Sequence, residues 1–231
     1  MTQFMKVVFL SVFAALMLSI TACSGKQEST ATKPSRNVEE GQALVLLRGL
    51  PTLGTVHSVA IVEVDPDAAN FGAILQEVEL PNLTQPMHHL YYSPTGRLYS
   101  TGLDPKCSLA EVGLSRNAQG TAVINGVNCL DTGGQQVGED IIWHSVNGKE
   151  YMFVTFMGGT GVEQADCGSV GVFDPQSNAL IKIIQARKSV VAKGAPYIMY
   201  PHGISVYQDR MVVGSAVHPD LKTGVGNAIA V

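Results

Sequence analysis

The chain beyond its first 42 residues alternates between short apolar runs and clusters of turn-forming residues. Runs rich in Val, Ile, Thr and Tyr that are bounded by Gly, Pro, Asn or Asp predict strands, and turns such as Val-Asn-Gly-Lys at 146–149 predict hairpins. No later stretch has the 3.6-residue period of an amphipathic helix. The predicted strands are Ala43–Leu47, Ser58–Val64, Ala73–Leu80, His89–Ser93, Leu98–Thr101, Leu109–Leu114, Ala122–Val127, Ile141–Val146, Tyr151–Phe156, Ser169–Phe173, Leu180–Gln185, Gly203–Tyr207, Met211–Ser215 and Ala228–Val231.

These strands recur in a repeated order. The hairpin at 93–99 matches that at 145–151, and residues 89–98 match 202–211. Four strands in about 50–60 residues is the size of a β-propeller blade. The sequence therefore predicts an all-β propeller over 43–231 with about three to four four-stranded blades, an incomplete ring and hence a piece of a longer chain. The alternative is a β-sandwich whose hairpins are similar by coincidence.

The N-terminus has a different pattern. Lys6 is followed by an apolar run, Val7–Ile20, which is too short to span a bilayer of about 30 Å. The run ends in Ile20-Thr21-Ala22-Cys23, which resembles the lipobox of bacterial lipoproteins. The resemblance implies a signal peptide at 1–22 and a lipidated Cys23 in the cell envelope. In a Gram-negative source, Ser24 implies sorting to the outer membrane. A plain secretory signal is the alternative.

Residues 23–42 are polar and have too little apolar surface to offset the entropy of ordering, which predicts a flexible tether.

The charge composition argues against nucleic-acid binding. The chain has 15 basic and 19 acidic residues and a net charge of -4, so there is no basic footprint for nucleic acid. Few charges (15%) and 24 glycines agree with an all-β protein that has tight turns.

A family resemblance rests on three short pieces: Met87-His88-His89, Cys107 and the strand start at 138–143. The repeated segments of the predicted blades resemble bacterial YVTN-type propeller repeats and, more narrowly, the selenium-binding protein/methanethiol oxidase family. The resemblance could cover about 47–231, although the spacing from histidine to cysteine differs from the family pattern. It implies a propeller and, in the narrower case, a metal-dependent oxidoreductase.

The alignment places histidines at equivalent strand starts. It pairs His89 with Ile141 and His202, and His88 with Asp140. The first strand of each blade lines the central channel of a propeller, so His89, His202 and Asp140 could hold a divalent transition metal at its mouth, with His88 as the alternate ligand. The alternative is that they cap strand starts by hydrogen bonding. His144 falls outside this ring, and His57 and His218 lie near turns and are expected to be solvated.

Three cysteines remain after Cys23. Export places them in an oxidising compartment. Cys107 and Cys129 flank the outer strands of one predicted blade and could form a disulfide, but either could also pair with Cys167.

Two function classes follow. The first is a lipid-anchored envelope propeller that binds a protein or a small molecule and acts as a platform. The second is a metal-dependent oxidoreductase of the selenium-binding protein type, with its site at the channel mouth. Fold alone does not decide between them, because a propeller can serve either purpose.

Lipidation at Cys23 is directly testable. The variant Cys23→Ser should accumulate as unprocessed precursor and should lose labelling with a fatty-acid analogue, because the thiol that carries the lipid is gone. Undiminished labelling of this variant would contradict the lipobox interpretation.

Overall fold

Antiparallel strands make up the regular structure. The computed structural model describes residues 41–50, 54–158, 168–185, 200–216 and 229–230, which all belong to one unit, Val38–Val231. Each predicted strand is formed, with its ends shifted by no more than a few residues. The strands are β1 (Gln42–Leu47), β2 (His57–Glu63), β3 (Ile74–Leu80), β4 (Met87–Tyr92), β5 (Leu98–Gly102), β6 (Leu109–Arg116), β7 (Ala122–Cys129), β8 (Gly138–Val146), β9 (Lys149–Phe156), β10 (Ser169–Phe173), β11 (Leu180–Gln185), β12 (Pro201–Tyr207), β13 (Arg210–Ser215) and β14 (Ile229–Ala230).

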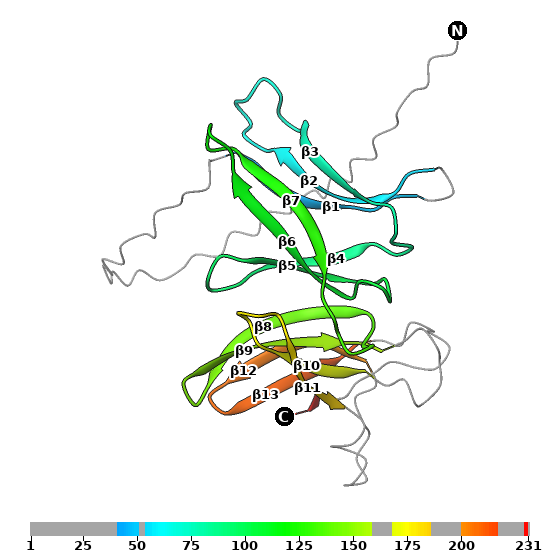
Figure 1. Cartoon of the computed structure of the whole chain (residues 1–231), viewed down its shortest axis with the longest axis vertical. Helices are drawn as coiled ribbons and strands as arrows, with labels where there is room; N and C mark the ends of the chain where they lie inside the picture. Colours follow the sequence, from blue (N-terminus) through cyan, green and yellow to red (C-terminus); the bar gives the residue numbers. More distant parts are fainter. Residues whose placement is uncertain (1–40, 51–53, 159–167, 186–199, 217–228, 231) are drawn as a thin grey trace, which may run out of the picture. The chain divides into compact units, whose positions relative to one another are not determined.

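The strands form four antiparallel sheets in chain order, each a meander of consecutive strands (Figure 1). The first sheet is β1–β3, the second β4–β7, the third β8–β11 and the fourth β12–β14. The repeat predicted four-stranded units, and the second and third sheets have four strands while the other two have three. Among the described residues there is no α-helix, and hence none long and apolar enough to cross a membrane.

One irregularity recurs at the start of three sheets. In the second sheet Met87 pairs with Gly102 and Leu90 with Ser100, so two residues of β4 face the single residue Thr101 of β5. The same β-bulge, two residues opposite one, opens the third and the fourth sheet. The bulge residues are His88 and His89 opposite Thr101, Glu139 and Asp140 opposite Thr155, and His202 and Gly203 opposite Gly214.

Apolar side chains fill the spaces between successive sheets. A cluster of buried residues joins the second sheet to the third, and half-buried Trp143 packs against it. A second cluster joins the first and second sheets around Val59, Ile61 and Leu98. A third, around Phe153 and Ile204, joins the third and fourth sheets. Members of the first cluster are Tyr99, Leu109, Ile141, Met152, Val154, Phe156 and Phe173.

Gly138 allows the second and third sheets to approach closely beside the bulge of β8. A Cβ atom on this residue would lie 2.0 Å from the carbonyl oxygen of Ser108, far inside van der Waals contact. Only glycine leaves room for that backbone. The residue that follows, Glu139, is therefore held against the second sheet.

Expectations about single residues and about the N-terminal segment can also be compared with the structure. Cys107 and Cys129 form a disulfide across the β6–β7 pair, the first of the pairings that the sequence left open. The expectation that His57 is solvated is wrong: its side chain is buried, and its Nδ1 accepts a hydrogen bond from the Gly49 amide. Gln42 begins β1 although it was expected to end the tether. The predicted signal peptide, the predicted tether up to residue 40, Cys167 and His218 lie outside the described residues.

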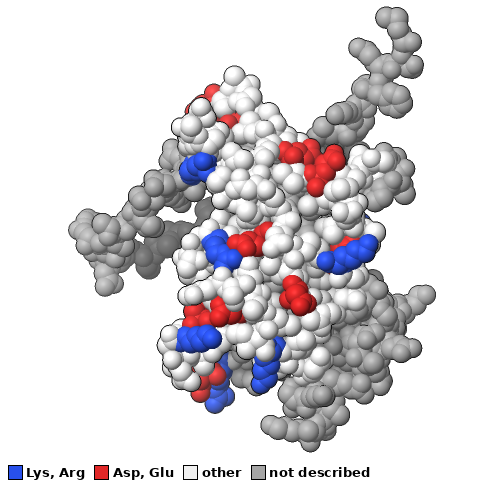
Figure 2. Space-filling model, viewed as in Figure 1, with Lys and Arg blue, Asp and Glu red and all other residues white. Residues whose placement is uncertain are grey.

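A polar network also links the second and third sheets. The guanidinium of Arg97 donates to both carboxylate oxygens of Glu111, at 2.7 and 2.8 Å, and to the carbonyl oxygens of Pro175 and Gln176. Asn178 donates to Glu111 and accepts from the hydroxyl of Tyr99. These hydrogen bonds therefore tie the β5–β6 pair to the β10–β11 turn. Elsewhere, basic and acidic side chains are interspersed on the face drawn in Figure 2.

Removing Arg97 should weaken this junction measurably. We expect Arg97→Ala to lower the free energy of unfolding by about 1–3 kcal/mol, because it removes a partly buried partner of a carboxylate and donors to two carbonyls. Chemical denaturation at neutral pH measures the change. Lys149→Ala is the matched control, since its side chain is 58% exposed and its ammonium is 3.9 Å from the Asp174 carboxylate.

The same junction predicts an acid dependence. The Arg97 guanidinium, and after it Asn178, lower the pKa of Glu111 below its ordinary value of 4.5. A depressed pKa in the folded state means that the stabilisation is present above the unfolded pKa and is lost as the pH falls through the folded one. The stability difference between wild type and Arg97→Ala should therefore shrink as the pH falls below about 4.5. A difference that is constant down to pH 2 would contradict the role of the ion pair.

Candidate metal-binding site

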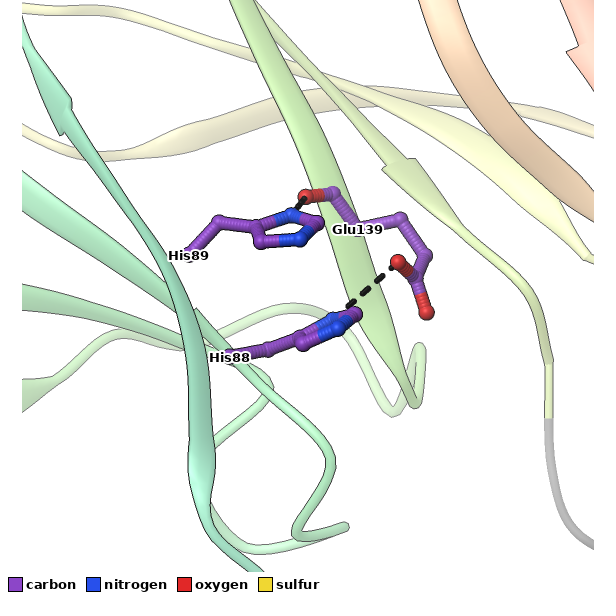
Figure 3. A group of neighbouring side chains, drawn as sticks. All are labelled: His88, His89 and Glu139. Carbon is purple, nitrogen blue, oxygen red and sulfur yellow. Dashed lines mark hydrogen bonds and ion pairs between the residues drawn. The ribbon is translucent and has the colours of Figure 1, made fainter. Parts of the chain in front are cut away.

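His88 and His89 are the two bulge residues of β4, and both rings lie on the side that faces β8 (Figure 3). In a regular strand, adjacent side chains would point to opposite faces. The bulge breaks this alternation, and the two imidazoles stack with their centroids 3.8 Å apart and their planes 21° from parallel. Both histidines are therefore available to one site.

Glu139, the first bulge residue of β8, lies between histidines of two other sheets. Its side chain is only 3% exposed, and its Oε2 is 3.1 Å from Nδ1 of His88 and 3.3 Å from Nε2 of His202. The two histidine side chains are 32% and 45% exposed, so solvent reaches the group from their side. One ligand atom from each of His88, His89 and Glu139 lies within 4.8 Å of the others. These three side chains come from two sheets, and His202 of a third sheet meets the group at Glu139.

The backbone carbonyl of Glu139 sets the orientation of His89. It accepts hydrogen bonds from His89 Nδ1 at 2.9 Å, from the Tyr91 hydroxyl at 3.0 Å and from the Thr101 hydroxyl at 3.1 Å. Because a carbonyl can only accept, Nδ1 of His89 must carry a proton. The network therefore assigns the Nδ1–H tautomer to neutral His89, which leaves the lone pair on Nε2 for a ligand.

Charge and burial act together on two neighbouring groups. The Glu139 carboxylate raises the pKa of His88 above its ordinary 6.5, against the smaller opposing effect of burial. Burial, together with the carboxylates of Asp140 and Glu139, raises the pKa of Tyr91 well above its ordinary 10.0. Tyr91 is therefore a protonated donor at any physiological pH, as its bond to the Glu139 carbonyl requires.

The atoms around Oε2 of Glu139 have the spacing of metal ligands. Ligands at 2.0–2.1 Å from a tetrahedral ion lie about 3.3–3.4 Å from one another. The observed separations of 3.1 and 3.3 Å to the two histidine nitrogens are close to that edge length. Nδ1 of His88 and Oε2 of Glu139 are also buried without a hydrogen bond of normal geometry. These two separations therefore fit ligands of a shared transition-metal ion, and a ligand atom of His89 lies within 4.8 Å of those of His88 and Glu139.

Of the residues singled out in the sequence, His88, His89 and His202 come together in this group. Asp140 lies beside it, and its carboxylate oxygens accept hydrogen bonds from the amides of Ile141 and Ile204. His144 lies apart, as expected, with Nε2 2.9 Å from the carbonyl oxygen of Gln208.

Sequence reasoning missed Glu139, the carboxylate at the centre of the group. The bulges make His88, Glu139 and His202 equivalent, so the alignment that paired His88 with Asp140 is one residue out of register. The paired segment between bulge and turn is Ile141–Val146 in β8 but only Leu90–Tyr92 in β4. An ungapped alignment through the turns therefore slips at the bulge. Anchoring it on the strand starts Met87, Gly138 and Pro201 would have found Glu139.

Comparison with known proteins adds no relative: no family model, curated protein or solved structure matches the chain. What the structure itself supports is an all-β protein of several antiparallel sheets with a possible histidine and glutamate metal-binding group.

The tautomer of His89 can be measured without any metal. We expect the ring nitrogens of His89 in the neutral state to give the chemical shifts of the Nδ1–H form, because Nδ1 faces an acceptor. Long-range proton–nitrogen NMR correlation spectra report the two nitrogens separately. Tyr91→Phe should keep this tautomer, since the carbonyl remains. An Nε2–H pattern in the wild type would contradict the assigned network.

Proposed function

We propose that this chain is a lipid-anchored β-propeller of the cell envelope that binds one divalent transition-metal ion. The observation that carries the metal assignment is the buried carboxylate of Glu139, which has a nitrogen of His88 and of His202 within 3.3 Å. Imidazole nitrogens with one carboxylate suit zinc, copper, nickel or iron rather than calcium or magnesium. The ion would be held by His88 Nδ1, His202 Nε2, Glu139 Oε2 and Nε2 of His89.

Asp140 has a different part in this proposal. The sequence named it as the carboxylate ligand, but both of its oxygens are engaged by backbone amides. A carboxylate held in this way supports the bulges and adds negative charge near the ion. Glu139 therefore replaces it among the proposed ligands.

The propeller is supported by the order and likeness of the sheets. Four meanders follow one another along the chain, and three of them open with the same bulge at the same place. Blades of a propeller have this form, and their first strands stand side by side around the axis. The contacts between bulge residues of β4, β8 and β12 agree with that arrangement. The resemblance to YVTN-type repeats points the same way.

The lipid anchor and the location rest on the lipobox. Cys23 would hold the propeller at a membrane surface, on the outer membrane if the source is Gram-negative. The metal site would then face the periplasm or the exterior, where a small molecule or a protein could reach it.

A second candidate is an oxidoreductase of the selenium-binding protein/methanethiol oxidase type. The exposure of His88 and His202 favours it, because solvent access leaves room for an exogenous ligand on the ion. Oxygen consumption by the metal-loaded protein in the presence of methanethiol would support it. Tight metal binding without any such consumption would favour the binding platform.

Metal binding should depend on the four clustered residues. We expect the purified chain to bind one Zn²⁺ or Co²⁺, and His88→Ala, His202→Ala and Glu139→Gln each to weaken binding by more than the roughly 10–100-fold that changes outside the ligand shell cause. Calorimetric titration and elemental analysis measure affinity and stoichiometry. His144→Ala is the matched control, because this histidine is bonded to Gln208 instead. No binding by the wild type, or equal losses in His144→Ala and His202→Ala, would rule out the site.

A further inference from the structure

Two threonines occupy the same position in successive sheets. Thr101 of β5 and Thr155 of β9 are each the single residue that faces a bulge, so neither has a ladder partner on the bulged strand. Both are completely buried. The fourth sheet has Gly214 at this position.

Each threonine hydroxyl joins the bulge of its own sheet to the bulge of the next. The Thr101 hydroxyl accepts from the His89 amide at 3.3 Å and donates to the Glu139 carbonyl at 3.1 Å. The Thr155 hydroxyl accepts from the Asp140 amide at 3.0 Å and donates to the His202 carbonyl at 2.5 Å. The pattern is identical: the amide comes from the second bulge residue, and the carbonyl belongs to the first bulge residue of the following sheet.

A hydroxyl is the group that this position requires. A bulge removes backbone groups from the ladder, and a buried amide or carbonyl without a partner costs about 1–3 kcal/mol. One hydroxyl can donate once and accept once or more, so it satisfies an amide on one side and a carbonyl on the other. Valine has the same shape and can do neither.

We propose that Thr101 and Thr155 are positioning residues of the metal site: each bridge fixes the distance between the bulges of neighbouring sheets, and side chains of these bulges hold the ion. The claim rests on the proposed metal-binding function. It goes beyond it, because these threonines touch no ion and act through the backbone of Glu139 and of His202. The bridges fix the backbone from which the Glu139 and His202 side chains project. These side chains would then need only small rotations to bind the ion.

The two bridges should differ in strength. The Glu139 carbonyl has two further donors, His89 Nδ1 and the Tyr91 hydroxyl, so it stays partnered without Thr101. Among the described residues, the Thr155 hydroxyl is the donor recorded for the His202 carbonyl, and the His202 side chain is 45% exposed and could turn into solvent. Thr155 is therefore expected to matter more than Thr101.

The test compares Thr155→Val, Thr155→Ser and Thr101→Val in the full chain with Co²⁺ as the probe. We expect Thr155→Val to weaken Co²⁺ binding by about 10–100-fold, the range for changes behind a ligand, and to alter the visible absorption of the bound ion. Thr155→Ser keeps the hydroxyl and should stay within about threefold of the wild type. Thr101→Val should lie between them. Wild-type affinity and spectrum in Thr155→Val would overturn the proposal.

A control variant separates a loss of ligand positioning from a general loss of protein stability. Thr132→Val makes the same change at a buried threonine whose hydroxyl donates to the Gln135 carbonyl rather than to a bulge residue. It should leave Co²⁺ binding unchanged even if it lowers the melting temperature. If Thr155→Val does not fold, Thr101→Val decides the matter: an unchanged affinity and spectrum would overturn the proposal.

A metal-free measurement distinguishes this inference from the proposed function. In the wild type and in Thr155→Ser, the ring protons of His202 should show a nuclear Overhauser effect to the side-chain protons of Glu139, because Nε2 and Oε2 are 3.3 Å apart. Thr155→Val should lose it. If the wild type binds no Co²⁺ but this pattern holds, the metal function fails and the positioning role stands. Absence of the effect in the wild type, or its persistence in Thr155→Val, overturns the positioning role.

Discussion

At each bulge, two residues of a first strand share the space opposite one residue of the second, and the backbone groups that lose their ladder partners must find others. In this chain the carbonyls find theirs in the preceding sheet. The Glu139 carbonyl turns to Thr101, Tyr91 and His89, and the His202 carbonyl turns to Thr155. These hydrogen bonds between sheets help to fix how neighbouring sheets pack. They also fix the position of the candidate ligands, because the bulge residues whose backbone groups need partners are the histidines and the glutamate themselves.

Burial of Glu139 explains why the group attracts positive charge. A carboxylate that is 3% exposed is unfavourable unless charges or donors compensate it, and no Lys or Arg is paired with it among the described residues. The imidazoles of His88 and His202 remain. A proton on His88 is one solution, which is why its pKa is raised. A metal ion is the other, and it satisfies the carboxylate and the nitrogens at once. A proton and the proposed metal ion would therefore compete for this carboxylate.

The strands could be predicted because runs of Val, Ile, Thr and Tyr stand between turn-forming residues, a signal that holds even for β5 and β10, which are buried throughout. The histidines could be predicted because they recur at strand starts. Glu139 could not, because a bulge inserts one residue into a strand and leaves no mark of its own in the sequence pattern. His57 was misjudged for a related reason: it stands beside a turn, but its Nδ1 closes that turn by accepting from Gly49 and so lies inside.

The three bulges have the same backbone pairing but differ in the side chains that hydrogen-bond to them. The second and third sheets each have a threonine opposite the bulge, whereas the fourth has Gly214, and the second bulge residue there is Gly203. These glycines can offer no side-chain bond. Among the described residues, the backbone around His202 is held by the Thr155 hydroxyl on its carbonyl and by the Asp140 carboxylate on the amide of Ile204. Glu139 is buried, and its carbonyl accepts from three donors. In the proposed site, Glu139 would therefore be the fixed ligand and the half-exposed His202 the adjustable one, past which an ion would enter.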